Sequence, residues 1–240
     1  MLNAHSLVKR NAFHMLTAEV LSVQPNLICI CETWFKDKHS EKLFTIDGYT
    51  CHRRDRKGKA AGGVCMYIRN ELQCRQLLVR KQCDLSEMLW VRVNINETLQ
   101  YCICVCYHPP KPRYSSAELI STFQDNFTEL ISMFPNDVFV LTGDLNQLNY
   151  NTILVDFGLS QIVTEPTRNT NILDVFITNR PDLFNCYVAK SVLKSDHYAV
   201  YVNCTGAKNS TKNCATATAA SRKQVKCYKH HHHHLRLLIG

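Results

Sequence analysis

The sequence predicts an α/β fold, because apolar strand-like segments alternate along the chain with segments of helical periodicity. The runs at residues 27–31 and 137–142 are dominated by apolar side chains, which suits central strands covered on both faces. Residues 11–23 and 115–133 repeat apolar side chains at helical spacing. With 45% hydrophobic residues, the 240-residue chain can bury the core of one large domain or two small ones.

The remaining elements are predicted from helix-ending residues and from the alternation of apolar and polar side chains. Pro25 ends the first helix, and Ser115 or Ser116 is a suitable cap for the second long one. Two strand pairs lie between these helices, the first of them a hairpin around a basic loop. We expect strands at 49–54, 62–68, 87–95, 99–107 (turning at Asn96-Glu97), 172–177, around Tyr187 and at 198–202, and a short helix at 149–158.

Composition excludes several classes of protein. No apolar stretch reaches 18 residues, so we expect no membrane span. Residues 1–10 lack the apolar core of a secretory signal, which predicts a protein that is not secreted. The 13 cysteines lie mostly within apolar strand-like runs and form no pair of zinc-binding turns. We interpret them as buried thiols of a reducing compartment, nuclear or cytoplasmic.

The net charge of +8 belongs to the end of the chain. Residues 206–240 carry seven Lys or Arg and no Asp or Glu. We therefore divide the chain into a domain at 1–204 and a basic, disordered tail at 205–240, which contains five consecutive histidines at 230–234. Residues 52–59 form a basic cluster within the domain, which is either a contact for a phosphate backbone or a solvated hairpin.

Polar residues recur at the ends of the predicted strands. Hard oxygen ligands such as Glu32 suit Mg²⁺, which binds one or two carboxylates together with phosphate oxygens. Asp144 and Asn146 could position a water molecule, and His197 could donate a proton to a phosphate oxygen. Asp174 could orient that imidazole. The set comprises Asn3, Glu32, Tyr107, Asp144, Asn146, Asp174, Asp196 and His197.

A Ser-His-Asp hydrolase that uses Ser195 is a competing scheme. It is less favoured, because Ser195 lies only two residues from His197 on the same predicted strand. The sequence also lacks a nucleophile-elbow pattern.

The ordered motifs resemble the endonuclease/exonuclease/phosphatase superfamily over about residues 2–204. They are similar to one branch above all, the endonuclease domain of non-LTR (LINE-type) retrotransposons. The superfamily likeness rests on Glu32-Thr33-Trp34, Gly143-Asp144-Leu145-Asn146, Leu173-Asp174 and Ser195-Asp196-His197. The branch is suggested by residues 2–7, 53–56, 62–64, 107–110 and 166–168.

The resemblance implies a four-layer α/β/β/α sandwich of two mixed sheets flanked by helices. It implies cleavage of DNA phosphodiester bonds with Mg²⁺, or Mn²⁺ in its place, by a monomer that leaves a 3′-hydroxyl. Glu32 and Asp196 would be the metal ligands. The resemblance assigns Asn3, Ser195 and Arg168 to the substrate phosphate, and Asp144, Asn146, Asp174, His197 and Tyr107 to catalysis.

Three features depart from this pattern. The family has a strand before the Asn3 motif, whereas only Met1 and Leu2 precede Asn3 here, so we expect the first strand to be missing. His108 follows Tyr107 where the pattern has arginine. No reverse-transcriptase domain follows residue 204. Two alternatives therefore stay open: a phosphatase or phosphodiesterase of the same superfamily, and an inactive, truncated relic that binds nucleic acid.

Overall fold

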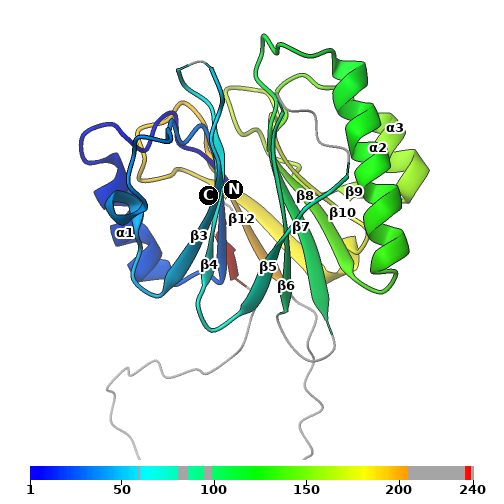
Figure 1. Cartoon of the computed structure of the whole chain (residues 1–240), viewed down its shortest axis with the longest axis horizontal. Helices are drawn as coiled ribbons and strands as arrows, with labels where there is room; N and C mark the ends of the chain where they lie inside the picture. Colours follow the sequence, from blue (N-terminus) through cyan, green and yellow to red (C-terminus); the bar gives the residue numbers. More distant parts are fainter. Residues whose placement is uncertain (59, 81–85, 95–98, 205–235, 239–240) are drawn as a thin grey trace, which may run out of the picture.

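Two β-sheets pack face to face, with helices on both outer surfaces (Figure 1). The computed structural model describes residues 1–58, 60–80, 86–94, 99–204 and 236–238. Helix α1 (Ala12–Val23) covers one sheet, and helices α2 (Ser116–Met133) and α3 (Asn151–Phe157) cover the other. The four-layer α/β/β/α prediction is confirmed.

The first sheet has the order β11-β12-β13-β2-β4-β3, and β1 also pairs with β2. Strands β1 and β13 run parallel to β2, and the other pairs are antiparallel. The strands are β1 (Leu2–Asn3), β2 (Leu27–Cys31), β3 (Tyr49–Arg54), β4 (Val64–Arg69), β11 (Phe184–Ala189), β12 (Ala199–Cys204) and β13 (Arg236–Leu238).

The second sheet has the order β5-β6-β7-β8-β10-β9. Only β7 and β8 are parallel neighbours in it. Two short 3-10 helices, Glu41–Phe44 and Pro181–Leu183, lie in connections. The strands are β5 (Gln73–Leu77), β6 (Glu87–Asn94), β7 (Gln100–Tyr107), β8 (Val138–Asp144), β9 (Ser160–Gln161) and β10 (Asp174–Thr178).

The core has three parts, one for each contact between layers. Alternating residues of the central strands face either the opposite sheet or a helix. In β2, Cys29 and Cys31 pack between the sheets, whereas Ile28 and Ile30 pack under α1. The three alternating cysteines of β7 all pack against α2 and α3, as their spacing predicts. They are Cys102, Cys104 and Cys106, all with free thiols.

Several local expectations differ from the structure. The strand expected at 172–177 begins only at Asp174, as β10, so the Asp174 carboxylate lies at the sheet edge. The strand expected at 137–142 extends to Asp144, so Gly143 lies within β8. Strands β5 and β9 were not predicted, because they are short and partly polar. The tail predicted to be disordered contains a strand, β13. The expected turn at 96–97 and residues 205–235, which include the histidine run, lie outside the described residues.

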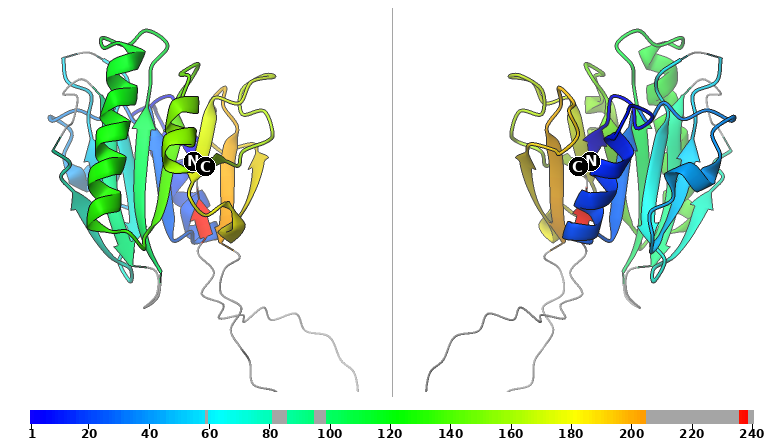
Figure 2. Two further views of the ribbon diagram at one scale, coloured as in Figure 1. Left: turned by 90° about the vertical axis from the view of Figure 1, so that its right-hand side faces the viewer. Right: turned by 90° about the vertical axis from the view of Figure 1, so that its left-hand side faces the viewer.

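The strand expected to be missing before Asn3 is reduced to β1, which pairs Leu2 with Ile30 and Asn3 with Cys31. Met1 extends this pairing on the other side, because its amino group donates to the Val200 carbonyl at 2.5 Å. Strand β13 lies in the same sheet as β1 and pairs with both β2 and β12 (Figure 2).

Within the described residues, no helix is both long and apolar enough to cross a bilayer.

A substitution at Gly143 would test how closely β8 packs against β7. A Cβ atom at this position would lie 1.8 Å from the Cys106 carbonyl oxygen, and the φ of +142° disfavours any other residue. We predict that Gly143→Ala lowers the free energy of unfolding by about 3 kcal/mol or more, through strain and overpacking. Urea denaturation measures the loss.

Gly158 supplies the control, because it also has a positive φ, of +60°, but a Cβ there would meet nothing within 4 Å. Gly158→Ala should cost only about 1 kcal/mol. Equal costs for the two variants would contradict the close-packing explanation.

Candidate active site

The predicted polar residues meet at one edge of the two sheets. Asn3 and Glu32 stand at the ends of the parallel strands β1 and β2, and Asp144 at the end of β8. Asp174 begins β10, which runs antiparallel to β8 and pairs Asp174 with Asp144. His197 lies just before β12. Strand direction therefore brings the ends of some strands and the starts of others to the same edge.

The side-chain amide of Asn3 connects the two sheets. Its Nδ2 atom donates to Glu32 Oε1 at 2.8 Å and to Asp144 Oδ2 at 2.7 Å. Asn3 and Asp144 are both buried. Glu32 is partly exposed and accepts a further hydrogen bond from Trp34 Nε1 at 3.3 Å. The amide thus holds two carboxylates of different sheets side by side.

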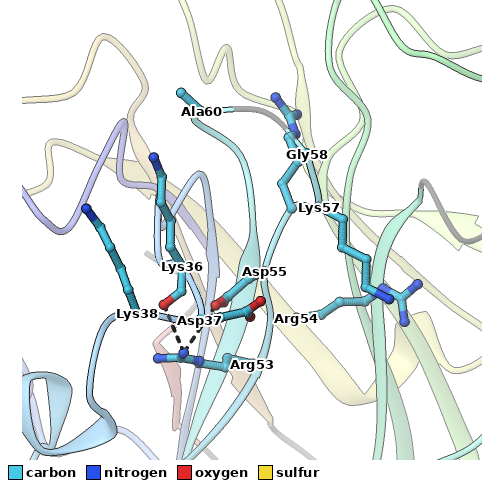
Figure 3. Close-up of a pocket in the computed structure, with 10 residues that line it drawn as sticks. Lys36, Asp37, Lys38, Arg53, Arg54, Asp55, Lys57, Gly58 and Ala60 are labelled. Carbon is cyan, nitrogen blue, oxygen red and sulfur yellow. Dashed lines mark hydrogen bonds and ion pairs between the residues drawn. The ribbon is translucent and has the colours of Figure 1, made fainter.

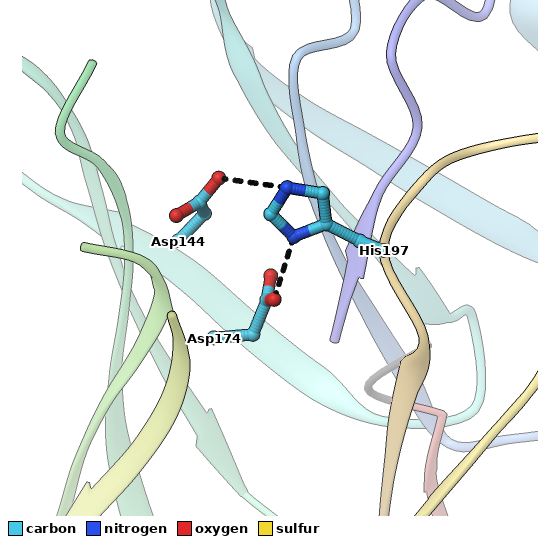
Figure 4. A group of neighbouring side chains, drawn as sticks. All are labelled: Asp144, Asp174 and His197. Carbon is cyan, nitrogen blue, oxygen red and sulfur yellow. Dashed lines mark hydrogen bonds and ion pairs between the residues drawn. The ribbon is translucent and has the colours of Figure 1, made fainter. Parts of the chain in front are cut away.

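His197 lies between two aspartates (Figure 4). Its Nδ1 atom is 2.7 Å from Asp174 Oδ2, and its Nε2 atom is 3.8 Å from Asp144 Oδ2. The Thr167 hydroxyl accepts hydrogen bonds from the Leu173 and Asp174 backbone amides, which fixes the start of β10. Both imidazole nitrogens therefore face carboxylates, and the contact with Asp174 fixes the orientation of the ring.

Burial and mutual repulsion shape the proton affinities of this group. Desolvation, followed by the charge of Asp174, raises the pKa of Asp144 to about 7, although His197 and Asn3 oppose the shift. Burial alone lowers the pKa of His197, but its hydrogen bond to Asp174 and the charges of Asp174 and Asp144 outweigh burial and raise it. Asp144 can therefore change protonation near pH 7, and His197 holds its proton more tightly than a free imidazole.

Asn146 and Tyr107 border the same group. The Asn146 backbone amide donates to Asp144 Oδ1 at 3.0 Å, and its side-chain Nδ2 donates to the His108 carbonyl at 2.7 Å. The φ of +47° at Asn146 and of +55° at Glu32 are unusual for these residues, and such strain concentrates at functional sites. The Tyr107 hydroxyl hydrogen-bonds Glu32, and burial, followed by the charge of Glu32, raises the Tyr107 pKa.

Three predicted residues lie at the rim instead. Arg168 Nη2 contacts Asp196 Oδ2 at 2.5 Å, and His5 lies 3.7 Å from the same carboxylate. Asp196 is half exposed, and although partial burial raises its pKa, the charges of Arg168 and His197 outweigh this and lower it. The Ser195 hydroxyl accepts from the His197 backbone amide at 3.2 Å, so it caps the loop and nothing in the imidazole contacts favours a Ser-His-Asp arrangement.

The donor set suits a hard divalent cation. Ligand atoms of Asp144, Asp174 and His197 lie within 4.8 Å of one another and could bind a metal ion. The buried Asp174 Oδ1 has no hydrogen-bond partner. Among the described residues, Glu32 accepts hydrogen bonds only from neutral groups and forms no ion pair. Carboxylates without a compensating cation are the ligands that Mg²⁺ or Mn²⁺ favours.

One ion pair beside the site was not predicted. Glu87 begins β6 and is buried, and it accepts from Arg56 Nε at 2.5 Å and from the Gly63 amide. The Arg56 guanidinium lies 5.5 Å from the centre of the Tyr107 ring. A cation of the basic cluster therefore lies beside the Tyr107 ring, close to the site. A charged residue opening an apolar strand, as Glu87 does, was the available sequence signal.

The basic cluster lines a cavity of about 760 Å³ (Figure 3). Its walls are the loop after Glu32 and the tip of the β3–β4 hairpin. Arg53 is fixed there by the Lys36 and His39 carbonyls and by Asp55, at 3.1 to 3.4 Å. The lining residues are mainly cationic: Lys36, Asp37, Lys38, Arg53, Arg54, Asp55, Arg56, Lys57, Gly58 and Ala60.

Several solved structures have a similar fold. The AP endonuclease LMAP from Leishmania major has a TM-score of 0.63 and 14% identity, over 82% of this chain and 84% of that one. An AP endonuclease from Archaeoglobus fulgidus has a TM-score of 0.59 and 14% identity, over 82% and 95%. TDP2 from D. rerio, complexed with a single-strand DNA product, has a TM-score of 0.56 and 11% identity, over 83% and 95%.

No curated protein sequence matches the chain. Residues 9–197, most of its length, match the Endonuclease/Exonuclease/phosphatase family, whose members are metal-dependent phosphodiester hydrolases. The strand-end carboxylates, the oriented histidine and this match lead to one conclusion: the chain belongs to the Endonuclease/Exonuclease/phosphatase family.

Proposed function

We propose that the protein is a Mg²⁺-dependent endonuclease that hydrolyses DNA phosphodiester bonds and derives from a non-LTR retrotransposon. The observation that carries the proposal is the connected group in which Asn3 joins Glu32 to Asp144 and His197 lies between Asp144 and Asp174. This group offers oxygen ligands, a base and an oriented acid within one buried edge, as phosphodiester hydrolysis requires.

The residues divide the reaction among them. A bound Mg²⁺, or Mn²⁺, held by Glu32 with Asp196 nearby, would neutralise charge on the phosphate. Asp196 is paired with Arg168, so its role as a ligand requires that it exchange this partner. Asp144 has a pKa of about 7, and its ionised carboxylate accepts a proton from the attacking water.

The remaining polar groups act on the phosphate. Protonated His197, oriented by Asp174, donates to a non-bridging or leaving oxygen. Tyr107 and Asn146 contact the reacting phosphate beside Asp144. Asn3, Ser195 and Arg168 position the substrate phosphate at the rim.

DNA is favoured over a small phosphoester by the basic cavity. Several cations line a cavity beside the loop that follows Glu32, so a polyanion that occupied the site could extend into it. Two AP endonucleases and a TDP2 complexed with a single-strand DNA product are among the structural neighbours, which supports the same class of substrate. The retrotransposon origin rests on the ordered motifs at 53–56, 62–64, 107–110 and 166–168.

The first test is nicking of supercoiled plasmid DNA with Mg²⁺ and with EDTA. We expect nicking that needs the metal and falls by at least about 100-fold in His197→Ala, because the positioned proton donor is lost. His14→Ala, an exposed position on α1, is the matched control and should retain full activity.

Each other outcome has a definite meaning. Nicking that survives in His197→Ala would contradict this site. A folded protein that does not nick DNA but cleaves a nucleotide or lipid phosphoester would be the phosphatase or phosphodiesterase alternative. A folded protein that binds DNA without any metal-dependent cleavage would be the inactive relic.

The raised pKa of Asp144 predicts that metal binding releases a proton. Below about pH 7 the metal-free carboxyl is neutral, and Mg²⁺ favours the ionised form, so affinity should rise between pH 6 and pH 8. Calorimetry in buffers of different ionisation enthalpy measures the number of protons released. In Asp144→Asn this proton should disappear, and an affinity that is independent of pH in the wild type would contradict the prediction.

The basic cavity predicts a specific loss of DNA affinity. Lys36→Gln/Lys38→Gln should weaken binding of a duplex oligonucleotide and lower the salt dependence by about two in log–log slope, if each lysine neutralises one phosphate. Fluorescence anisotropy in EDTA at several salt concentrations measures both quantities without cleavage.

The control removes two positive charges from the opposite edge of the sheets. Arg69 and Arg180 lie at the far ends of β4 and β10, away from the site. Arg69→Gln/Arg180→Gln should leave the slope nearly unchanged. If both double variants weaken binding equally, net charge rather than the cavity determines affinity.

A further inference from the structure

The first sheet contains a gap that β1 fills only in part. Strand β1 pairs with the last two residues of β2, and Met1 exchanges two hydrogen bonds with Val200 of β12, at 2.5 and 3.0 Å. The first half of β2, from Leu27, and the second half of β12, to Cys204, have no partner in β1. Unpaired backbone groups in the middle of a buried sheet are costly, so this gap needs another strand.

Strand β13 lies in that gap and pairs with both neighbours. It is parallel to β2, with Leu237 opposite Leu27 and Leu238 opposite Ile28. It is antiparallel to β12, with Leu237 opposite Val202. Figure 2 shows this short segment between the two strands.

The registers of β13 and β1 are continuous. Along β2, Leu238 lies opposite Ile28 and Leu2 opposite Ile30, which leaves one position, opposite Cys29, for Met1. Along β12, the same count from Leu237 opposite Val202 reaches Met1 opposite Val200, which is the hydrogen-bonded pair observed. The two segments therefore form one composite strand in phase with both neighbours.

We propose that Arg236–Leu238 is an intramolecular complementing strand that completes the first sheet and thereby maintains the spacing of the active site. The sequence around it, Leu235-Arg236-Leu237-Leu238-Ile239, has the apolar character of a central strand. The surface that receives it is the pair of facing edges of β2 and β12, and the partner that fits is an extended apolar peptide, as in strand addition to a sheet.

The composite strand separates the two strands that carry the chemistry of the first sheet. Glu32 follows β2 and His197 precedes β12, while Asn3 ends the composite strand itself. One intervening strand sets these neighbours about 10 Å apart, twice the spacing between adjacent strands. Loss of β13 leaves that spacing to β1 alone, so His197 would lose its fixed position relative to Glu32.

Hydrogen exchange of the full-length wild-type protein tests directly whether residues 236–238 occupy the gap between β2 and β12. We expect the amides of residues 236–238 to exchange at least about 100-fold more slowly than in an unstructured peptide, because they lie between two strands. Exchange at the unprotected rate would overturn the proposal without the need for any variant.

A proline variant tests whether β13 stabilises the first sheet. Leu237→Pro removes a backbone donor, and we expect faster exchange in β2 and β12 and a Tm lower by about 5 to 10 °C. Thr216→Pro, elsewhere in the tail, is the control and should change neither quantity. A Leu237→Pro protein with wild-type Tm and exchange would refute the role of β13.

A synthetic peptide of residues 233–240 and measurements at several protein concentrations test whether the strand in the gap comes from the same chain or from a second copy. Added in excess to Leu237→Pro, it should restore protection in β2 and β12. In the wild type, protection should not depend on protein concentration, and the protein should be monomeric by light scattering. Protection that grows with concentration together with a dimer would show that a second copy donates the strand, which would overturn the intramolecular proposal. These readouts do not depend on nuclease activity.

Discussion

The site depends on two hydrogen bonds donated by one amide, that of Asn3, to Glu32 in the first sheet and to Asp144 in the second. Adjacent carboxylates repel each other strongly when buried, and a neutral donor shared between them reduces this cost. The amide can serve both because Asn3 ends β1, whose position is fixed by pairing with β2. The contact between the sheets and the geometry of the site therefore have the same origin.

The negative charge collected at this edge explains both its proton affinity and its affinity for a cation. Asp144 and Asp174 lie within reach of a single imidazole, so their charge is only partly compensated. Burial, together with this excess of negative charge, raises the pKa of Asp144, whereas the pKa of His197 rises against the effect of burial because Asp174 and Asp144 favour its charged form. A divalent cation neutralises the same charge, so protons and metal compete for one site.

The sequence predicts the parts of the site that follow strand ends and misses those that depend on loops. Glu32, Asp144 and His197 were predicted because each adjoins an apolar strand, and strand direction then brings them together. The contact of Arg56 with Glu87 joins a hairpin tip to a distant strand, and no periodicity indicates it. The short apolar run around β13 follows a polar tail, and its pairing with β2 and β12 joins residues distant in the sequence, which no local pattern indicates.

In the proposed nuclease, the groups that carry out the chemistry and those that select the substrate lie on different parts of the fold. The carboxylates and the histidine adjoin strands that pair on both sides, so their geometry is set by the backbone of two sheets. The cations of the basic cavity lie on the loop after Glu32 and on a hairpin tip, where sequence can change without disturbing those strands. In the proposed nuclease, the paired strands therefore position the hydrolytic groups, whereas the cations of the basic cavity would select which phosphoester reaches them.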